Sequence, residues 1–342
     1  MNTQTISLTR GRAGRYAATA LGAVVLALGA FAPVAAQAAA PKTLYVSQGG
    51  LDSGTCPAAS PCATVSYALT KAASGATIKV SGTIDDHLVI SSPVTITTWP
   101  GGPARSPAVL DGTASGAVVT VTGIGVTLHD LTIENGSDGF AGGIFNEEGT
   151  VTVTDSTVTG NAGGNSGGGI GNYGGGTMTV IDSTITKNSD PSVGAGINNG
   201  GTLTVIASTI AGNTGGGIYS GQGVTATLGA TIVAGNAGGN CSGYDAASLD
   251  SAGYNLTSDK TGKACAFTAA TDRVNKNPLL GHLAKNGGLT KTLLPAATSP
   301  ANDVIPKVTT LRGVAVCPGT DQRGVTRPAQ GETRCTIGAV EI

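Results

Sequence analysis

Short segments in which apolar residues alternate with threonine recur along the middle of the chain. The clearest copies are T-V-T-V-T-D-S-T-V-T-G-N at 150–161, T-M-T-V-I-D-S-T-I-T-K-N at 177–188 and T-L-T-V-I-A-S-T-I-A-G-N at 202–213. A period of two is typical of a strand with one buried face. We expect that face to hold Val151, Val153, Met178, Val180, Leu203 and Val205.

The spacing of the copies predicts one coil per repeat. Asn161, Asn188, Asn213 and Asn236 close successive copies, at separations of 27, 25 and 23 residues. A second phrase follows each first one, at 142–146, 168–172, 195–199 and 216–220. Because no single repeat can bury its apolar face alone, stacked repeats must form a common core. We therefore predict an all-β protein, a single-stranded right-handed parallel β-helix.

The repeated asparagines lie where such a coil turns. Their side chains can bond to neighbouring backbone groups, and asparagine tolerates left-handed dihedral angles. We expect Asn161, Asn188, Asn213 and Asn236 to form a structural ladder rather than to bind a ligand. The variable insertions between the two phrases project from one side, which is the side where we expect binding.

Composition changes along the chain suggest four segments. Residues 1–40 resemble a signal peptide, 41–117 an N-terminal cap with the first irregular coils, 118–243 the regular repeats, and 244–342 the last coils and a C-terminal cap. Solenoid ends expose strand edges and need covering. A short helix over Cys62–Ala73 is predicted to plug the first coil.

The N-terminal leader predicts export. Arg10, Arg12 and Arg15 precede an apolar run at 17–32 and small residues that suit cleavage. No later segment approaches the length of about 20 apolar residues that a membrane-spanning helix needs. We expect a secreted or extracellular monomer with no membrane span in the mature chain.

Charge argues against nucleic acid as a partner. The leader holds three of the 19 basic residues and none of the 20 acidic ones, which leaves 16 against 20 and a net charge near −4. Charged residues make up 11% of the chain, aromatic residues 4%, and glycine occurs 55 times. This composition fits a solenoid better than an ordinary globular core or a disordered chain.

Six cysteines in an exported chain predict disulfides rather than a metal site. Six cysteines allow 15 connectivities. We favour the three local pairs, which lie outside the repeats: Cys56 with Cys62, Cys241 with Cys265, and Cys317 with Cys335.

Several motifs together resemble bacterial secreted β-helix proteins of the pectin-lyase-like fold with a choice-of-anchor Q type C-terminal signature. They are T-L-Y-V-S at 43–47, P-C-A-T at 61–64, G-Y-N-L at 253–256, N-P-L-L-G-H-L at 277–283, N-G-G-L-T-K-T at 286–292, S-P-A-N-D at 299–303, D-Q-R-G-V-T-R-P at 321–328 and C-T-I-G-A-V-E at 335–341. The resemblance implies a cell-surface β-helix but no particular reaction. The chain departs from the family pattern because neither a hydrophobic tail nor a sortase-type motif precedes Ile342.

One column of carboxylates carries the candidate chemistry. Asp130, Asp155 and Asp182 hold the same position in three successive copies. Stacked carboxylates can bind Ca²⁺ or act as acid and base on a glycoside. The column stops at Ala207 and Gly229.

A catalytic base for this column is missing from the repeats, where Lys187 is the only basic residue. Aspartate before Ser-Thr is also a common turn residue, which favours a structural role for the column. His129 beside Asp130 matches no defined metal motif, so we predict no metal site and no cofactor, with Ca²⁺ on the column as the alternative. In the C-terminal cap we expect a paired network that closes the last coil, made by Asp321, Arg323, Arg327 and Glu341.

Aromatic residues offer a second candidate surface. The middle residues of the second phrase, Phe145, Gly171, Asn198 and Tyr219, should point outward, with Tyr173 nearby. Phe145, Tyr173 and Tyr219 could stack on sugar rings. Because two of the four positions are aromatic, we expect scattered surface rings rather than a platform.

Two functions remain open. The favoured one is a secreted or surface-associated β-helix scaffold that binds glycan, cell envelope or host material without catalysis. The alternative is a carbohydrate-active enzyme, a polysaccharide lyase or glycoside hydrolase, that uses Asp130, Asp155 and Asp182.

Overall fold

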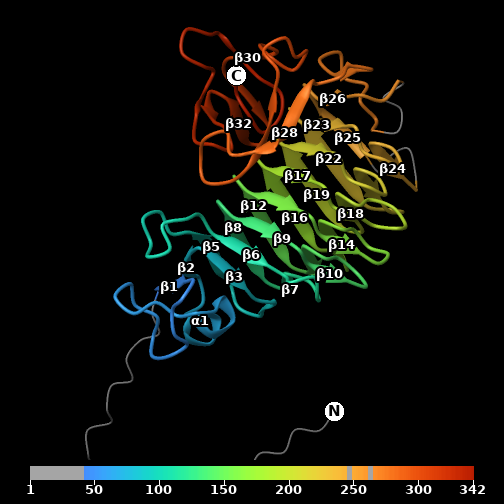
Figure 1. The fold of residues 1–342 in the computed structure, drawn as a ribbon. Coiled ribbons are helices and arrows are strands. Elements are labelled where there is room, and N and C mark those ends of the chain that lie inside the picture. The colour runs from blue at the N-terminus through green and yellow to red at the C-terminus, as the bar shows by residue number, and fades with distance from the viewer. Residues whose placement is uncertain (1–41, 245–248, 261–264) are drawn as a thin grey trace, which may run out of the picture. The chain divides into compact units, whose positions relative to one another are not determined.

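Three parallel sheets wind around one core in the computed structural model, which describes residues 42–244, 249–260 and 265–342 (Figure 1). Each complete coil passes once through sheet A, sheet B and sheet C, whereas the first and last described coils are incomplete. This arrangement confirms the predicted parallel β-helix. The signal peptide predicted for residues 1–40 lies outside the described residues.

The strands of the three sheets stack in coil order within the described residues. Sheet A contains β1 (Thr43–Ser47), β2 (Ala76–Ser81), β5 (Val94–Thr98), β8 (Gly125–His129), β12 (Thr150–Thr154), β16 (Thr177–Ile181), β19 (Thr202–Ile206), β22 (Thr225–Gly229) and β25 (Leu249–Gly253). Sheet B contains β3 (Thr83–Asp85), β6 (Val109–Asp111), β9 (Thr132–Glu134), β13 (Thr157–Thr159), β17 (Thr184–Thr186), β20 (Thr209–Ala211), β23 (Ile232–Ala234), β26 (Leu256–Thr257) and β27 (Arg273–Val274). Sheet C contains β4 (Leu88–Ile90), β7 (Val119–Thr122), β11 (Ile144–Glu147), β15 (Ile170–Tyr173), β18 (Ile197–Asn199), β21 (Ile218–Ser220) and β24 (Cys241–Gly243). Coils therefore extend on both sides of the regular repeats at 118–243.

The core is a set of apolar columns. Strands β12, β16 and β19 pair residue for residue, so each inward side chain lies on its counterpart in the next coil. The predicted inward residues are at most 1% exposed: Val151, Val153, Met178, Val180, Leu203 and Val205. Burial of this continuous apolar surface is the main force that holds the coils together.

The corner between sheets B and C is held by the predicted asparagine ladder. Asn161 donates from Nδ2 to Asn188 Oδ1 at 3.0 Å, and the same bond links Asn188 to Asn213 and Asn213 to Asn236. Each Nδ2 also donates to a backbone carbonyl of the preceding coil, for example Asn188 to Val158 O at 3.0 Å. The buried turn groups are thereby satisfied.

Two further ladders, which were not predicted from the sequence, hold the other corners. At the corner between sheets C and A, Asn146 donates to Asn172 at 2.7 Å, and Asn172 donates to Asn199 at 2.8 Å. At the corner between sheets A and B, the hydroxyl groups of Ser183 and Ser208 accept hydrogen bonds from the backbone N–H of Ser156 and Ser183. The signal for the first of these was the asparagine that ends three of the four second phrases, at Asn146, Asn172 and Asn199.

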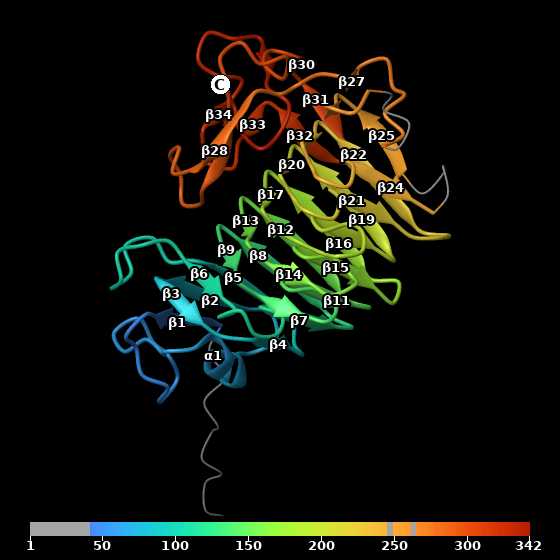
Figure 2. The same ribbon diagram turned by 45° about the vertical axis from the view of Figure 1, so that its right-hand side comes forward.

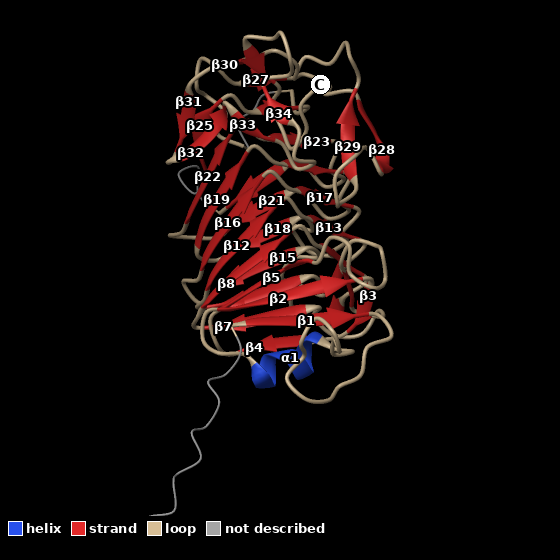
Figure 3. Ribbon diagram, turned by 90° about the vertical axis from the view of Figure 1, so that its left-hand side faces the viewer, coloured by secondary structure: helices blue, strands red, loops and turns tan. Residues whose placement is uncertain are grey.

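The N-terminal end is closed by a short helix and a disulfide-bonded loop. Helix α1 covers Val65–Lys71, less than the predicted range, because the Thr64 side chain caps it by accepting from Tyr67 N. Its residues Val65 and Ala68 are buried in the main core. The loop between Cys56 and Cys62 pairs with the free edge of β1 through backbone bonds to Tyr45 and Ser47. Figure 3 shows the helix beneath the first coils.

The C-terminal cap, residues 277–342, is built from short antiparallel pairs. Its strands are β28 (Leu280–Ala284), β29 (Thr292–Pro295), β30 (Ile305–Pro306), β31 (Thr309–Leu311), β32 (Val314–Cys317), β33 (Gly319–Thr320), β34 (Thr326–Arg327) and β35 (Arg334–Cys335). In Figure 2 the cap, coloured orange to red, lies beside the later coils. It contacts the outer face of sheet B, because Thr157 donates to Lys291 O at 2.6 Å and Ala339 N donates to Thr209 Oγ1 at 3.1 Å.

This lateral packing corrects the expectation that the cap network closes only the last coil. The cap reaches back to the coil of Thr157 and buries a second apolar cluster, in which Ile206 and Ile232 of the coils meet Val304 and Ile337 of the cap. Covering the flank removes apolar surface of sheet B from water.

All three disulfides join local pairs, as favoured from the sequence. They are Cys56–Cys62, Cys241–Cys265 and Cys317–Cys335. The expectation that all three lie outside the coils is wrong for Cys241, which belongs to β24 of sheet C and to the main core. Among the described residues no helix is both long enough and apolar enough to cross a membrane.

The asparagine ladder predicts a large stability loss at one position. Asn188 is fully buried, and its amide makes four hydrogen bonds, two to Asn161 and one each to Val158 and Asn213. Replacing Asn188 by alanine leaves buried partners unsatisfied, so we expect the free energy of unfolding to fall by about 3 kcal/mol. Urea titration followed by circular dichroism measures this change.

The matched control is Asn165→Ala, at an exposed position of the loop after Asn161. We expect a change within about 0.5 kcal/mol there. Equal urea midpoints for the two variants would show that the ladder does not stabilise the coil.

Candidate functional site

Three aspartates follow strands β8, β12 and β16 at the corner between sheets A and B. Asp130, Asp155 and Asp182 have φ angles of 56°, 51° and 44°, in the left-handed region that aspartate tolerates better than most residues. Because the strands before them pair in register, the three corners stack directly. The sequence was right to align these residues, but their side chains have different surroundings.

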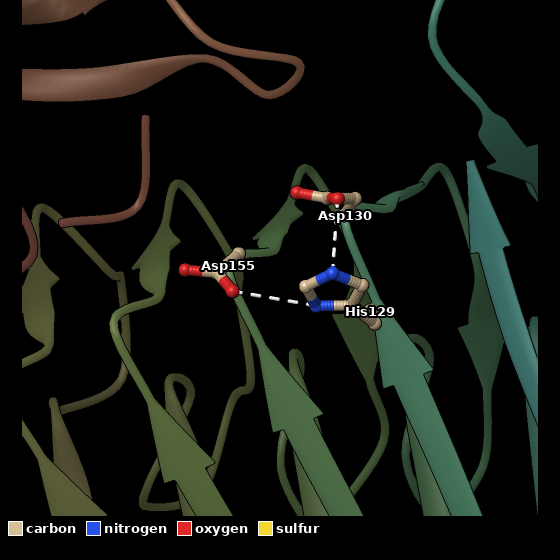
Figure 4. Close-up of side chains that lie close together, drawn as sticks. All are labelled: His129, Asp130 and Asp155. Carbon is tan, nitrogen blue, oxygen red and sulfur yellow. Dashed lines mark ion pairs between the residues drawn. The ribbon is translucent and has the colours of Figure 1, made fainter. Parts of the chain in front are cut away.

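Asp130 and Asp155 converge on His129 (Figure 4). The Nε2 atom of His129 lies 3.0 Å from Asp130 Oδ2, and its Nδ1 atom lies 3.3 Å from Asp155 Oδ2. The same Nδ1 atom is 2.8 Å from the hydroxyl oxygen of Thr154, which is His129's neighbour on the adjacent strand. The imidazole is thus held from both sides.

The two carboxylates make His129 a strong base. Hydrogen bonding to Asp130, and then to Asp155, raises the pKa of His129 from 6.5 to about 10, against the opposing effect of burial. Its side chain is 40% exposed, so solvent weakens the ion pairs. At neutral pH the ring is therefore a cation between two anions, and it is not available to accept a proton from a substrate.

A pocket of about 300 Å³ lies over this cluster. The coil corners with His129, Asp130 and Asp155 form one wall, and cap loops at 288–289 and 320–324 form the other. Within the cap wall, Arg323 donates from Nε and Nη2 to Asp321 Oδ2 at 2.9 and 2.7 Å. Sequence reasoning could not place Arg323 here, because the contact joins segments almost 200 residues apart.

Asp182 turns away from the pocket and pairs with the cap. Its Oδ1 accepts from Arg327 Nη2 at 3.0 Å, and the Arg327 side chain is 1% exposed. Arg327 also donates to the carbonyls of Thr336 and Gly338. Burial raises the pKa of Asp182 to about 7, although Arg327 lowers it.

Two expectations about the aspartate column are therefore wrong. The three carboxylates do not form one cluster, so the structure provides no three-aspartate Ca²⁺ site. A basic group is not missing either, because the cap supplies Arg327 to Asp182 and Arg323 to the pocket wall.

The column ends where the cap covers the corner. Its next members are Ala207 and Ala230, with φ angles of 48° and 51°, whereas Gly229 pairs with Ile206 one position earlier. The sequence alignment at Gly229 was thus one residue off. Both alanines belong to the apolar cluster shared with the cap, where an aspartate would lose its hydration.

Three members of the predicted cap network, Asp321, Arg323 and Glu341, bond to one another, whereas Arg327 pairs with Asp182 of the coils instead. Asp321 accepts from Arg323 and from the backbone of Glu341, and Glu341 accepts from the backbone N–H groups of Thr336 and Ala329. Burial raises the pKa of Glu341. These bonds fix the cap loops that line the pocket.

A row of three aromatic rings lies on the outer face of sheet C. The Phe140 and Phe145 rings stack with centroids 5.5 Å apart, and the Phe145 and Tyr173 rings are 6.0 Å apart. Phe140 is 59% exposed. The expectation of scattered rings is wrong for these three, and the sequence missed Phe140 because it lies in an insertion loop.

The close approach of Tyr173 depends on a glycine. A Cβ atom on Gly171 would lie 3.2 Å from Tyr173 Cε2 and 2.8 Å from Ala141 Cβ. Gly171 pairs with Phe145 in the sheet, so the Tyr173 ring can lie across it toward Phe145.

Tyr219 is not part of this row. Its position faces outward, in register with Asn198, but the insertion loops fold over both residues. A Cβ atom on Gly194 would lie 2.8 Å from Tyr219 Cβ, and Asn198 is only 4% exposed. The outward direction was predicted correctly, but Asn198 is buried, whereas Tyr219 is half-buried.

Comparisons with known proteins give no family assignment. No family model and no curated protein matches the chain. The crystal structure of pectate lyase Pel9A is similar to it at 14% sequence identity, with a TM-score of 0.46 and coverage of 87% of this chain and 96% of that chain. This similarity is too low to carry functional information, and the choice-of-anchor Q signature stays a prediction.

Burial of the Asp182 carboxyl group predicts a pH dependence of stability. The pKa of Asp182 is raised in the folded protein, so the folded state holds a proton that the unfolded chain releases above about pH 4. The contribution of Asp182 is therefore most favourable below pH 4 and is lost as pH rises to about 7. Relative to Asp182→Asn, wild-type protein should lose up to about 4 kcal/mol over this range, measured by urea titration at several pH values.

Asp250→Asn is the control, since it removes a carboxylate from an exposed ion pair with Arg312 of the cap. Such pairs contribute little to stability. If wild type and Asp182→Asn showed parallel pH profiles, the pKa of Asp182 would not be raised in the folded protein.

Proposed function

We propose that this chain is a secreted, non-catalytic β-helix that binds glycan along the outer face of sheet C. The row of Phe140, Phe145 and Tyr173 is the observation that carries this proposal. The row lies on the loop-bearing side. Three disulfides are consistent with an extracellular protein.

Aromatic rings in this arrangement suit the apolar faces of sugar rings. The Phe140 and Phe145 rings stack with planes 28° apart, and the Phe145 and Tyr173 planes differ by 39°, so the three rings form one continuous aromatic cluster. An extended saccharide can lie against several rings at once, which adds binding energy from each contact.

Carboxylates beside the row point to neutral glycans rather than polyuronates. Glu147 pairs with Tyr173 in the sheet and is exposed, and Asp138 precedes Phe140 by two residues. These groups can accept hydrogen bonds from sugar hydroxyls, whereas an anionic uronate would be repelled.

The carboxylates of the aspartate column are already paired with cations, which favours binding over catalysis. His129 bridges Asp130 and Asp155, and Arg327 holds Asp182 beneath the cap. The rival function, a polysaccharide lyase or glycoside hydrolase, is favoured by one observation: oxygens of Asp130 and Asp155 lie within 4.8 Å of each other at a pocket.

Removal of the central ring tests the proposal. We expect wild-type protein to bind neutral glycans on an array and Phe145→Ala to bind the best of them about 10-fold more weakly in calorimetry, because stacking contributes roughly 1 kcal/mol or more. Tyr244→Ala, which removes an exposed ring outside the row, should leave the affinity unchanged.

The same glycans, incubated with the protein with and without Ca²⁺, separate the two functions. Release of reducing or unsaturated ends that Asp155→Ala abolishes would establish an enzyme instead. A silent array would remove the glycan proposal and favour a structural or protein-adhesion role.

A further inference from the structure

The cluster at the corner between sheets A and B combines the donor types of a transition-metal site. His129, Asp130 and Asp155 each offer one ligand atom, and these atoms all lie within 4.8 Å of one another. We propose that the three residues bind one divalent transition-metal ion of the Zn²⁺ class. An imidazole nitrogen with two carboxylates suits Zn²⁺ better than Ca²⁺, which prefers oxygen ligands alone.

The histidine is oriented for this role by its neighbour. In the metal-free protein the Nε2 proton is bound by Asp130 at 3.0 Å, and a metal ion would displace this proton into solvent and take its place on Nε2. The hydroxyl oxygen of Thr154, 2.8 Å away, can accept the remaining proton, which stays on Nδ1. Metal-binding histidines commonly use their second nitrogen in this way. Ligand atoms around a zinc ion lie about 3.0–3.4 Å apart, so Nε2 and Asp130 are already near that separation.

The charge around the pocket favours a cation. Asp130, Asp155 and Asp321 line it together with Arg323. Because Arg323 is bound to Asp321 at 2.7 Å, its charge is balanced within the cap wall. Among the side chains that line the pocket, the imidazole of His129 is then the one cationic group that contacts the carboxylates of Asp130 and Asp155. A divalent ion would balance the two negative charges of these carboxylates.

An ion can reach this site and complete its coordination there. The side chains of His129, Asp130 and Asp155 are 40%, 23% and 25% exposed. The pocket of about 300 Å³ has room for water molecules in the remaining coordination positions. The ligands come from two adjacent coils, whose paired strands fix the distance between them.

Metal titration of the tag-free full-length protein tests the proposal. Calorimetry at one fixed pH should show one Zn²⁺ bound per chain, with Ca²⁺ at least 30-fold weaker. His129→Gln and Asp155→Asn should each weaken Zn²⁺ binding at least 30-fold, and Thr154→Val, which removes the orienting hydroxyl, about 10-fold. Co²⁺ in place of Zn²⁺ should give a visible absorption band that His129→Gln removes.

Two control variants each alter one histidine or one aspartate of the coils that is not part of the cluster. His87→Gln alters a histidine that follows Asp86, and Asp111→Asn alters a carboxylate whose register partners are Asp85 and Glu134. Both should bind Zn²⁺ as wild type does, and urea midpoints confirm that every variant is folded. Absence of Zn²⁺ binding, equal affinity for Ca²⁺, or unchanged Zn²⁺ affinity in His129→Gln would each overturn the proposal.

Discussion

The regular coils of this protein turn three times each, and these turns bury backbone groups that the strands leave unpaired. Side-chain ladders supply the missing hydrogen bonds: one through Asn161, Asn188, Asn213 and Asn236, one through Asn146, Asn172 and Asn199, and one through Ser156, Ser183 and Ser208. A ladder works only if equivalent residues lie directly above one another. The ladders therefore fix the register of the strands, and with it the apolar columns of the core.

Fixed register turns a repeated residue into a column, but the surroundings decide what each member of that column does. The left-handed corner after sheet A carries Asp130, Asp155, Asp182, Ala207 and Ala230 on nearly the same backbone. The first two face a pocket and share His129, the third is covered and paired with Arg327, and the alanines pack against the cap. Aspartate thus persists where water or a cation can reach the corner and is replaced where apolar cap residues cover it.

Local periodicity explains why the coils could be predicted and the site could not. The inward face, the asparagine ladder and the three disulfides follow from patterns within about 30 residues. The partners of the aspartates do not, because Arg323 and Arg327 reach them through the folding of the cap along the flank. Phe140 was missed for a related reason, since its loop has no repeat partner and its contact with Phe145 depends on the path of that loop.

The coils supply the carboxylates of the aspartate column, and the cap supplies a cation that pairs with one of them. Within the repeats, the acidic column has one lysine nearby in sequence, Lys187, and its side chain is exposed. The cations that contact the column are the imidazole of His129 and the guanidinium of Arg327. The cap therefore contacts a carboxylate that the repeat supplies, and cap loops form one wall of the pocket over Asp130 and Asp155. The buried pair at Asp182 is costly to desolvate, so the apolar cluster between cap and sheet B must provide most of the energy that holds this wall in place.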